Sequence, residues 1–133
     1  MQRAVRGAPA AARLRAWALA AARPGAAVTL RVVGVAEARR LNRAFRKRDY
    51  APNVLSFSYG PGHGDLVLCH PVIVREARKW GKDLSAHYAH LVVHGMLHLR
   101  GLAHARAADA RRMERAEIAL LGRLGFGNPY TVE

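Results

Sequence analysis

The sequence is poor in features that would point to a secreted or a membrane protein. It has one cysteine, Cys69, so an internal disulfide cannot form, and a small buried side chain is its simplest interpretation. It has no uninterrupted apolar stretch near the roughly 18 residues that a membrane span needs. It also has only 9 acidic residues against 22 lysines and arginines. These absences predict a basic protein of the cytoplasm that has no membrane partner.

The excess of positive charge is uneven along the chain. The formal net charge is +13; residues 1–50 hold 12 basic and 2 acidic side chains, and residues 51–133 hold 10 and 7. A basic half of this kind suits a polyanionic partner such as RNA, because it neutralises phosphates and releases counterions. The alternative is a compositional bias, since arginine and alanine are frequent throughout the chain.

Length and periodicity predict one domain over residues 1–133 with an α+β fold, a small β-sheet packed by helices. Residues 1–26 contain an amphipathic helix with its apolar face on Leu14, Trp17, Ala18 and Ala21, although a cleavable targeting segment is an alternative. Strands are expected at 28–33, 53–59 and 65–69, the last two antiparallel, and further helices at 36–45, 72–80, 86–99 and 107–124. The helix at 86–99 is apolar on nearly all sides, which predicts that it is central and buried.

That central helix carries the most informative motif. His94 and His98 are four residues apart, so they point from one helical face toward a common position. Gly101 can end the helix in a left-handed conformation and let the chain return His104 to the same place. Three imidazoles leave one tetrahedral position open, which is typical of catalytic Zn²⁺, here one ion per chain. Two histidines alone would more often be chance or core residues.

The spacing equals that of the metzincin proteases, but one departure is decisive. Those enzymes carry a general-base glutamate directly after the first histidine, and this chain has Gly95 there. Phosphodiester hydrolysis needs instead an activated nucleophile and cations that stabilise charge on phosphate oxygens. Arg46, Lys47 and Arg48 could supply such cations, with Arg46 the strongest candidate. The alternative for these three residues is an ordinary solvated run of charge.

The remaining histidines, His63, His70, His87 and His90, lack a comparable frame. His90 precedes His94 by four residues and could face the same site, but we expect a core or supporting role for it.

Several blocks in order resemble the YbeY-type endoribonucleases, also called rRNA maturation factors. They are VTLRVV (28–33), LNRAFR (41–46), PNVLSFS (52–58), GDLVLC (64–69), GKDLSAHYAHLVVHGMLHLRGLAH (81–104) and GFGNPY (125–130). The resemblance implies a metal-dependent endoribonuclease that acts in 16S rRNA 3′-end maturation and ribosome quality control, with RNA, the ribosome and ribosomal proteins as partners. It implies a mixed β-sheet packed by helices, with the histidine helix at the base of a cleft. It also implies His94, His98 and His104 as metal ligands, and Arg46 as the cleft arginine. We therefore expect Arg46 and His94 to be catalytic and Arg46, Lys47 and Arg48 to contact RNA.

This chain also departs from the family pattern. Ala103 stands before the third histidine where the family usually has aspartate, and Pro52 stands where it usually has threonine. An acid beside a metal ligand can orient it or handle protons, so its replacement bears on metal affinity and rate.

Two alternatives to the nuclease follow. One is a zinc-containing, ribosome-associated RNA-binding factor with little catalysis, and the other is a zinc hydrolase of another class, such as a peptidase.

Overall fold

The computed structural model describes residues 2–3, 7–60, 62–101 and 107–130. Its elements run in the order β1 (Gln2–Arg3), α1 (Ala11–Ala21), β2 (Ala27–Val33), α2 (Val35–Arg46), β3 (Val54–Gly60), β4 (His63–Cys69), α3 (His70–Lys79), α4 (Leu84–Leu99) and α5 (Ala107–Arg123). The predicted α+β class is confirmed, and each expected helix and strand is present. The short strand β1 was not predicted.

The strands form one mixed sheet in the order β1-β2-β4-β3. β2 is parallel to β1 and to β4, with Leu30 opposite Leu66, whereas β3 is antiparallel to β4. The expected hairpin of β3 and β4 is therefore correct. It makes β3 an edge strand, so one side of β3 is left for contacts with helices and solvent.

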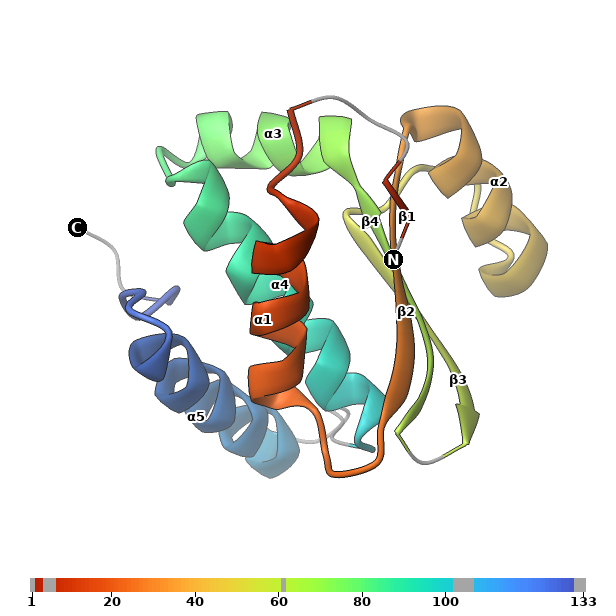
Figure 1. Ribbon diagram of the computed structural model, residues 1–133. Helices are drawn as coiled ribbons and strands as arrows, with labels where there is room; N and C mark the ends of the chain where they lie inside the picture. Colours follow the sequence, from red (N-terminus) through yellow and green to blue (C-terminus); the bar gives the residue numbers. More distant parts are fainter. Residues whose placement is uncertain (1, 4–6, 61, 102–106, 131–133) are drawn as a thin grey trace.

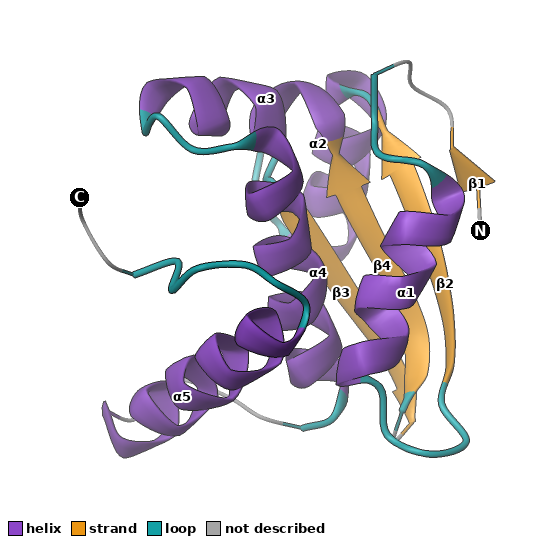
Figure 2. Ribbon diagram, turned by 60° about the vertical axis from the view of Figure 1, so that its left-hand side comes forward, coloured by secondary structure: helices purple, strands orange, loops and turns teal. Residues whose placement is uncertain are grey.

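Helices cover both faces of the sheet (Figure 1). Alternating side chains of β4 point to opposite sides: Leu66 and Leu68 join the larger apolar cluster with α1 and α4, and Val67 and Cys69 join the smaller one with α2. Cys69 is a buried free thiol, as expected. In the view of Figure 2, α1 and α4 lie in front of the sheet, and α5 packs on α4 from outside. Among the described residues, no helix combines the length and the apolar character that crossing a membrane requires.

The helix predicted within the first 26 residues belongs to the core. Leu14, Trp17, Ala18 and Ala21 are the buried residues of α1, which are the four expected on its apolar face. They pack with α4 and the sheet in the larger cluster. This packing favours a helix of the folded domain over a cleavable segment.

The buried helix α4 lies very close to the sheet. Its Gly95 has no room for a side chain, since a Cβ there would be 2.2 Å from Leu66 Cδ1 and 3.3 Å from Ser56 Oγ. Leu66 is itself completely buried in β4. The contact fixes the height of α4 above β3 and β4, and so the position of the histidines on either side of Gly95.

Candidate metal centre

The ends of α4 are defined by local interactions that set the register of its histidines. Asp83 caps the amino end, where its Oδ2 accepts a hydrogen bond from Ala86 N at 3.1 Å. Gly101 follows the carboxyl end with φ of +92°, and its N donates to His98 O at 2.9 Å. The left-handed glycine that the sequence predicted is thus present. It marks the end of α4 three residues after His98.

The two helical histidines of the motif face each other. His94 Nε2 and His98 Nε2 lie 3.1 Å apart, and the ring centroids are 4.7 Å apart. Two nitrogens bound to one tetrahedral zinc at 2.0–2.1 Å would be roughly 3.3 Å apart. The pair therefore fits two neighbouring ligands of one ion. His104, the third expected ligand, lies outside the described residues.

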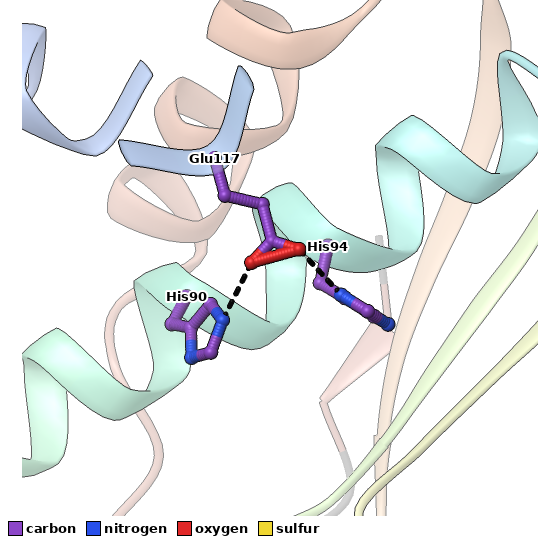
Figure 3. A group of neighbouring side chains, drawn as sticks. All are labelled: His90, His94 and Glu117. Carbon is purple, nitrogen blue, oxygen red and sulfur yellow. Dashed lines mark hydrogen bonds and ion pairs between the residues drawn. The ribbon is translucent and has the colours of Figure 1, made fainter. Parts of the chain in front are cut away.

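A buried carboxylate, Glu117 of α5, organises the same histidines. Its side chain is 1% exposed. Oε1 accepts from His94 Nδ1 at 2.8 Å, while Oε2 accepts from His90 Nε2 at 2.7 Å and from the Tyr130 hydroxyl at 2.6 Å. Figure 3 shows Glu117 reaching from α5 toward both rings. One residue thus connects two histidines of α4 with the segment that follows α5.

The environment of Glu117 keeps it ionised. Burial alone would raise the pKa of its carboxyl group, but hydrogen bonds from His90, His94 and Tyr130 outweigh burial and lower the pKa to about 2. Burial and the bond to Glu117 raise the pKa of Tyr130, so its phenol stays protonated and donates. A carboxylate at Nδ1 makes that nitrogen of His94 the protonated one. Nε2, which faces His98, is then the nitrogen able to bind a metal.

The residues His90, His94 and Glu117 also form a group that could itself hold a metal ion. Their potential ligand atoms all lie within 4.8 Å of one another. The nitrogen–oxygen distances of 2.7 and 2.8 Å are hydrogen-bond lengths, however, shorter than the roughly 3.3 Å expected between two ligands of one tetrahedral ion. In this structure Glu117 acts as a hydrogen-bonding partner of the histidines. This region of α4 can hold a metal in one of two places. The ion would lie either between His94 and His98 or within the group of His90, His94 and Glu117, and zinc analysis of variants distinguishes the two.

Arg46 shares a cavity with the two facing histidines. The cavity measures about 360 Å³ and is lined by Arg46, Val54, Ser56, Ser58, His94, His98 and Leu99. Arg46 is the last residue of α2, where its Nη2 donates to Ser56 O on β3 at 2.5 Å and its guanidinium lies 5.7 Å from the centroid of Phe57. The structure thus brings Arg46 together with His94 and His98, which are far from it in the sequence.

The other two basic residues expected to contact RNA lie beside this cavity rather than in its lining. Lys47 ends α2 in a left-handed conformation, with φ of 59°, and both Lys47 and Arg48 are exposed. They follow Arg46 directly in the chain and are exposed to solvent. This placement suits contacts with a phosphate backbone at the rim.

Sequence reasoning missed Glu117, although a signal for it exists. Met113, Leu120 and Leu121 are the other buried residues of α5. Glu117 lies four residues after Met113, three before Leu120 and four before Leu121. It therefore occupies the apolar stripe of an amphipathic helix. An acid on such a stripe needs a buried partner. Those partners are the imidazoles of α4.

Comparisons with known proteins show what this chain is similar to. The family model described as Endoribonuclease YbeY matches residues 10–125. A protein of Aromatoleum aromaticum with the name "Endoribonuclease YbeY" is 54% identical over 125 residues, covering 92% of this chain and 81% of its own length. One of Thiobacillus denitrificans with the same name is 51% identical over 127 residues, covering 92% and 86%. A solution structure from Thermotoga maritima has a TM-score of 0.63 at 19% identity, covering 98% of this chain and 99% of that one, which shows a shared fold.

Proposed function

The chain belongs to the endoribonuclease YbeY family, and on that premise we propose that it is a zinc-dependent, single-strand-specific endoribonuclease. The proposal includes maturation of the 3′ end of 16S rRNA and a part in ribosome quality control. It also includes a cytoplasmic location and the ribosome, with its proteins, as the physical context of the substrate.

One observation carries the proposal. The facing Nε2 atoms of His94 and His98 share a cavity with the guanidinium of Arg46. Imidazole nitrogens are good zinc ligands, and a guanidinium is the side chain best matched to phosphate oxygens. A phosphodiester placed between them would meet both groups that its hydrolysis needs.

Each residue has a distinct task in this proposal. His94, His98 and His104 would hold the zinc ion, which when bound supplies Lewis acidity and acidifies a water molecule. Arg46 binds the scissile phosphate and stabilises the negative charge that develops on its oxygens. Glu117 holds His94 in one tautomer through Nδ1. Lys47 and Arg48 attract the flanking backbone. Either water or the ribose 2′-hydroxyl can be the nucleophile in this scheme.

The position of Gly95 argues against a peptidase. A metzincin glutamate at this place would need a side chain where Leu66 Cδ1 already lies within 2.2 Å of the Cβ position. The packing of α4 on β4 therefore rejects that general base, in addition to the sequence lacking it. The non-catalytic RNA-binding alternative depends on Ala103, which lies outside the described residues, and is tested by turnover.

The test uses Arg46→Glu with Arg40→Glu as its control. Arg40 is on the same helix, its side chain is 70% exposed, and it does not line the cavity. Both variants replace an arginine by a glutamate, so they change the net charge equally. We expect Arg46→Glu to keep its zinc, measured by elemental analysis, and to lose RNA cleavage by about 100-fold or more, the typical cost of removing one group that stabilises transition-state charge. Arg40→Glu should keep both properties, apart from a small electrostatic loss of RNA affinity.

Three results would contradict the proposal. Normal cleavage by Arg46→Glu would remove Arg46 from the mechanism. Cleavage of casein with RNA left intact would favour a peptidase. Stability that depends on zinc, together with no turnover of any RNA, would favour a structural RNA-binding factor. Because so basic a protein binds RNA and carries contaminating nucleases, the zinc-free protein must be assayed in parallel.

A further inference from the structure

A larger cavity lies at the other end of α4 and has no part in the scheme above. It measures about 670 Å³ and lies between the turn that joins α3 to α4 and the segment after α5. Its lining includes Trp80, Lys82, His90, Phe126, Asn128 and Tyr130. Several of these residues come from the blocks GKD (81–83) and GFGNPY (125–130), which share the family resemblance but take no part in holding the metal or the scissile phosphate.

The walls of this cavity are held together by specific contacts. Lys82 Nζ donates to Pro129 O at 3.1 Å and lies 5.8 Å from the centroid of Trp80. Phe126 packs edge-on against the buried Trp17, with centroids 5.7 Å apart. The segment after α5 is thus tied to α1, to Glu117 through Tyr130, and to the α3–α4 turn. The cavity is a built feature of the fold.

Its chemistry combines exposed aromatic surface with positive charge. Trp80 is 52% exposed and Tyr130 is 44% exposed, so both offer ring surface to a ligand. Unpaired bases of single-stranded RNA stack on such rings, and a nearby lysine neutralises the attached phosphate. The volume lies within the usual range for pockets that bind small molecules. A nucleobase with its sugar is a chemically suitable occupant.

Neighbouring cavities with shared lining residues lead from this cavity to the candidate metal centre. Tyr130 also lines a cavity of about 140 Å³ with His94 and Glu117, and His94 in turn lines the cavity that contains Arg46. These spaces follow one side of α4. His90 and His98 are separated by eight residues, or about 12 Å along the helix axis. A strand of a few nucleotides can span that distance.

We propose that this cavity binds one unpaired nucleobase of the RNA substrate, stacked on Trp80, a few nucleotides from the phosphate held by Arg46. Lys82 contacts the phosphate next to that base. The inference rests on the proposed endoribonuclease activity and adds a determinant of where the RNA is cut. A protein segment that fills the cavity is the competing occupant.

The first test removes single bases from the substrate. A short single-stranded oligoribonucleotide with a mapped cleavage site is synthesised with one abasic residue at each position in turn. With wild-type protein, one position near the cleaved bond should raise KM about tenfold, the effect of losing one base–aromatic stack, with kcat nearly unchanged. Trp80→Ala should raise KM to a similar extent on intact RNA and show no further penalty at that position.

Matched variants separate the pocket from general charge effects. Lys82→Ala should raise KM, whereas Lys79→Ala, which removes an equal charge from an exposed position of α3, should change it little. Trp80→Phe keeps a stacking ring and should restore KM. Tryptophan fluorescence gives a second readout, because Trp80 is half-exposed and Trp17 is 5% exposed. Adding the oligoribonucleotide should quench the emission of wild type but not of Trp80→Phe.

The outcomes distinguish this inference from the proposed function. If RNA is cleaved but no abasic position is sensitive, or if Trp80→Ala keeps the same sensitive position, the base-binding pocket is wrong and the nuclease stands. If wild type cleaves no RNA, the proposed function fails and fluorescence decides the pocket. Emission that stays unchanged with saturating oligoribonucleotide then overturns the pocket, whereas quenching that requires Trp80 supports a base-binding site without cleavage.

Discussion

The two walls of the cavity that contains Arg46 differ in how firmly their side chains are held. On the α4–α5 side, His94 is tied to Glu117, which is almost fully buried and also binds His90 and Tyr130. On the α2–β3 side, Arg46 makes one hydrogen bond to a backbone oxygen and lies over Phe57, and its neighbours Lys47 and Arg48 project into solvent. A metal needs ligands fixed in advance, whereas an RNA backbone is met by adaptable surface charge. The difference in rigidity thus matches the difference in task.

The largest effect is expected from Glu117→Gln, which alters the firmly held α4–α5 side of the cavity. The amide cannot accept from three donors as a carboxylate does, so His94 should lose its fixed tautomer and zinc affinity should fall by about 10- to 100-fold. Competition with a fluorescent zinc chelator measures this change. Glu114→Gln, which removes an equal charge from an exposed position of α5, is the control and should bind zinc like wild type. Equal affinities for both variants would show that Glu117 does not support the metal.

The packing of α4 on β4 can be tested with Gly95→Ala. The added Cβ meets Leu66 at 2.2 Å, so the helix or the leucine must shift. We expect a loss of about 1–3 kcal/mol in the free energy of unfolding, as for other overpacked cores, measured by urea denaturation. Gly122→Ala in α5 is the matched control, because its Cβ would meet no atom within 4 Å. That variant should be neutral or more stable by up to about 1 kcal/mol. A Gly95→Ala protein as stable as wild type would contradict the close contact.

The stability of the fold should fall in acid because of His87, near the amino end of α4. His87 is buried, and desolvation lowers its pKa, as do Lys82 and His90, against the opposing effect of Glu76. Because the folded state prefers neutral His87, its contribution to stability is complete above the unfolded pKa of about 6.5 and is lost as pH falls below it. Denaturation midpoints at several pH values in wild type and His87→Phe test this. If the two proteins lost stability equally on acidification, His87 would not be the group responsible.

The smallest effect is expected from Arg48→Ala, on the α2–β3 side of the cavity. An exposed arginine that binds phosphate should contribute mainly to the salt dependence of RNA binding. The slope of log affinity against log salt should decrease by about 0.7 when one cation no longer neutralises a phosphate of a single strand. Arg75→Ala, an exposed arginine of α3, serves as the control. An unchanged slope for Arg48→Ala would place the RNA path away from the basic residues that follow α2.

Much of this architecture was predictable because periodicity dictates it. The four buried residues of α1, the antiparallel pairing of β3 with β4 and the left-handed Gly101 follow from local rules. β1 was missed because two residues hold too little pattern to detect. Glu117 and the pocket around Trp80 were missed because both depend on how α5 and its following segment pack on α4. Such long-range contacts leave only an indirect trace in the sequence, such as an acid on an apolar stripe.

The most direct measurement is the zinc content of His98→Ala beside that of His90→Ala, determined by elemental analysis after exhaustive dialysis. Both variants remove one imidazole from α4, but only His98 faces Nε2 of His94. We predict that His98→Ala loses its zinc, while His90→Ala retains about one ion per chain. Retention of zinc by His98→Ala together with its loss from His90→Ala would place the ion in the group of His90, His94 and Glu117, and would contradict the account.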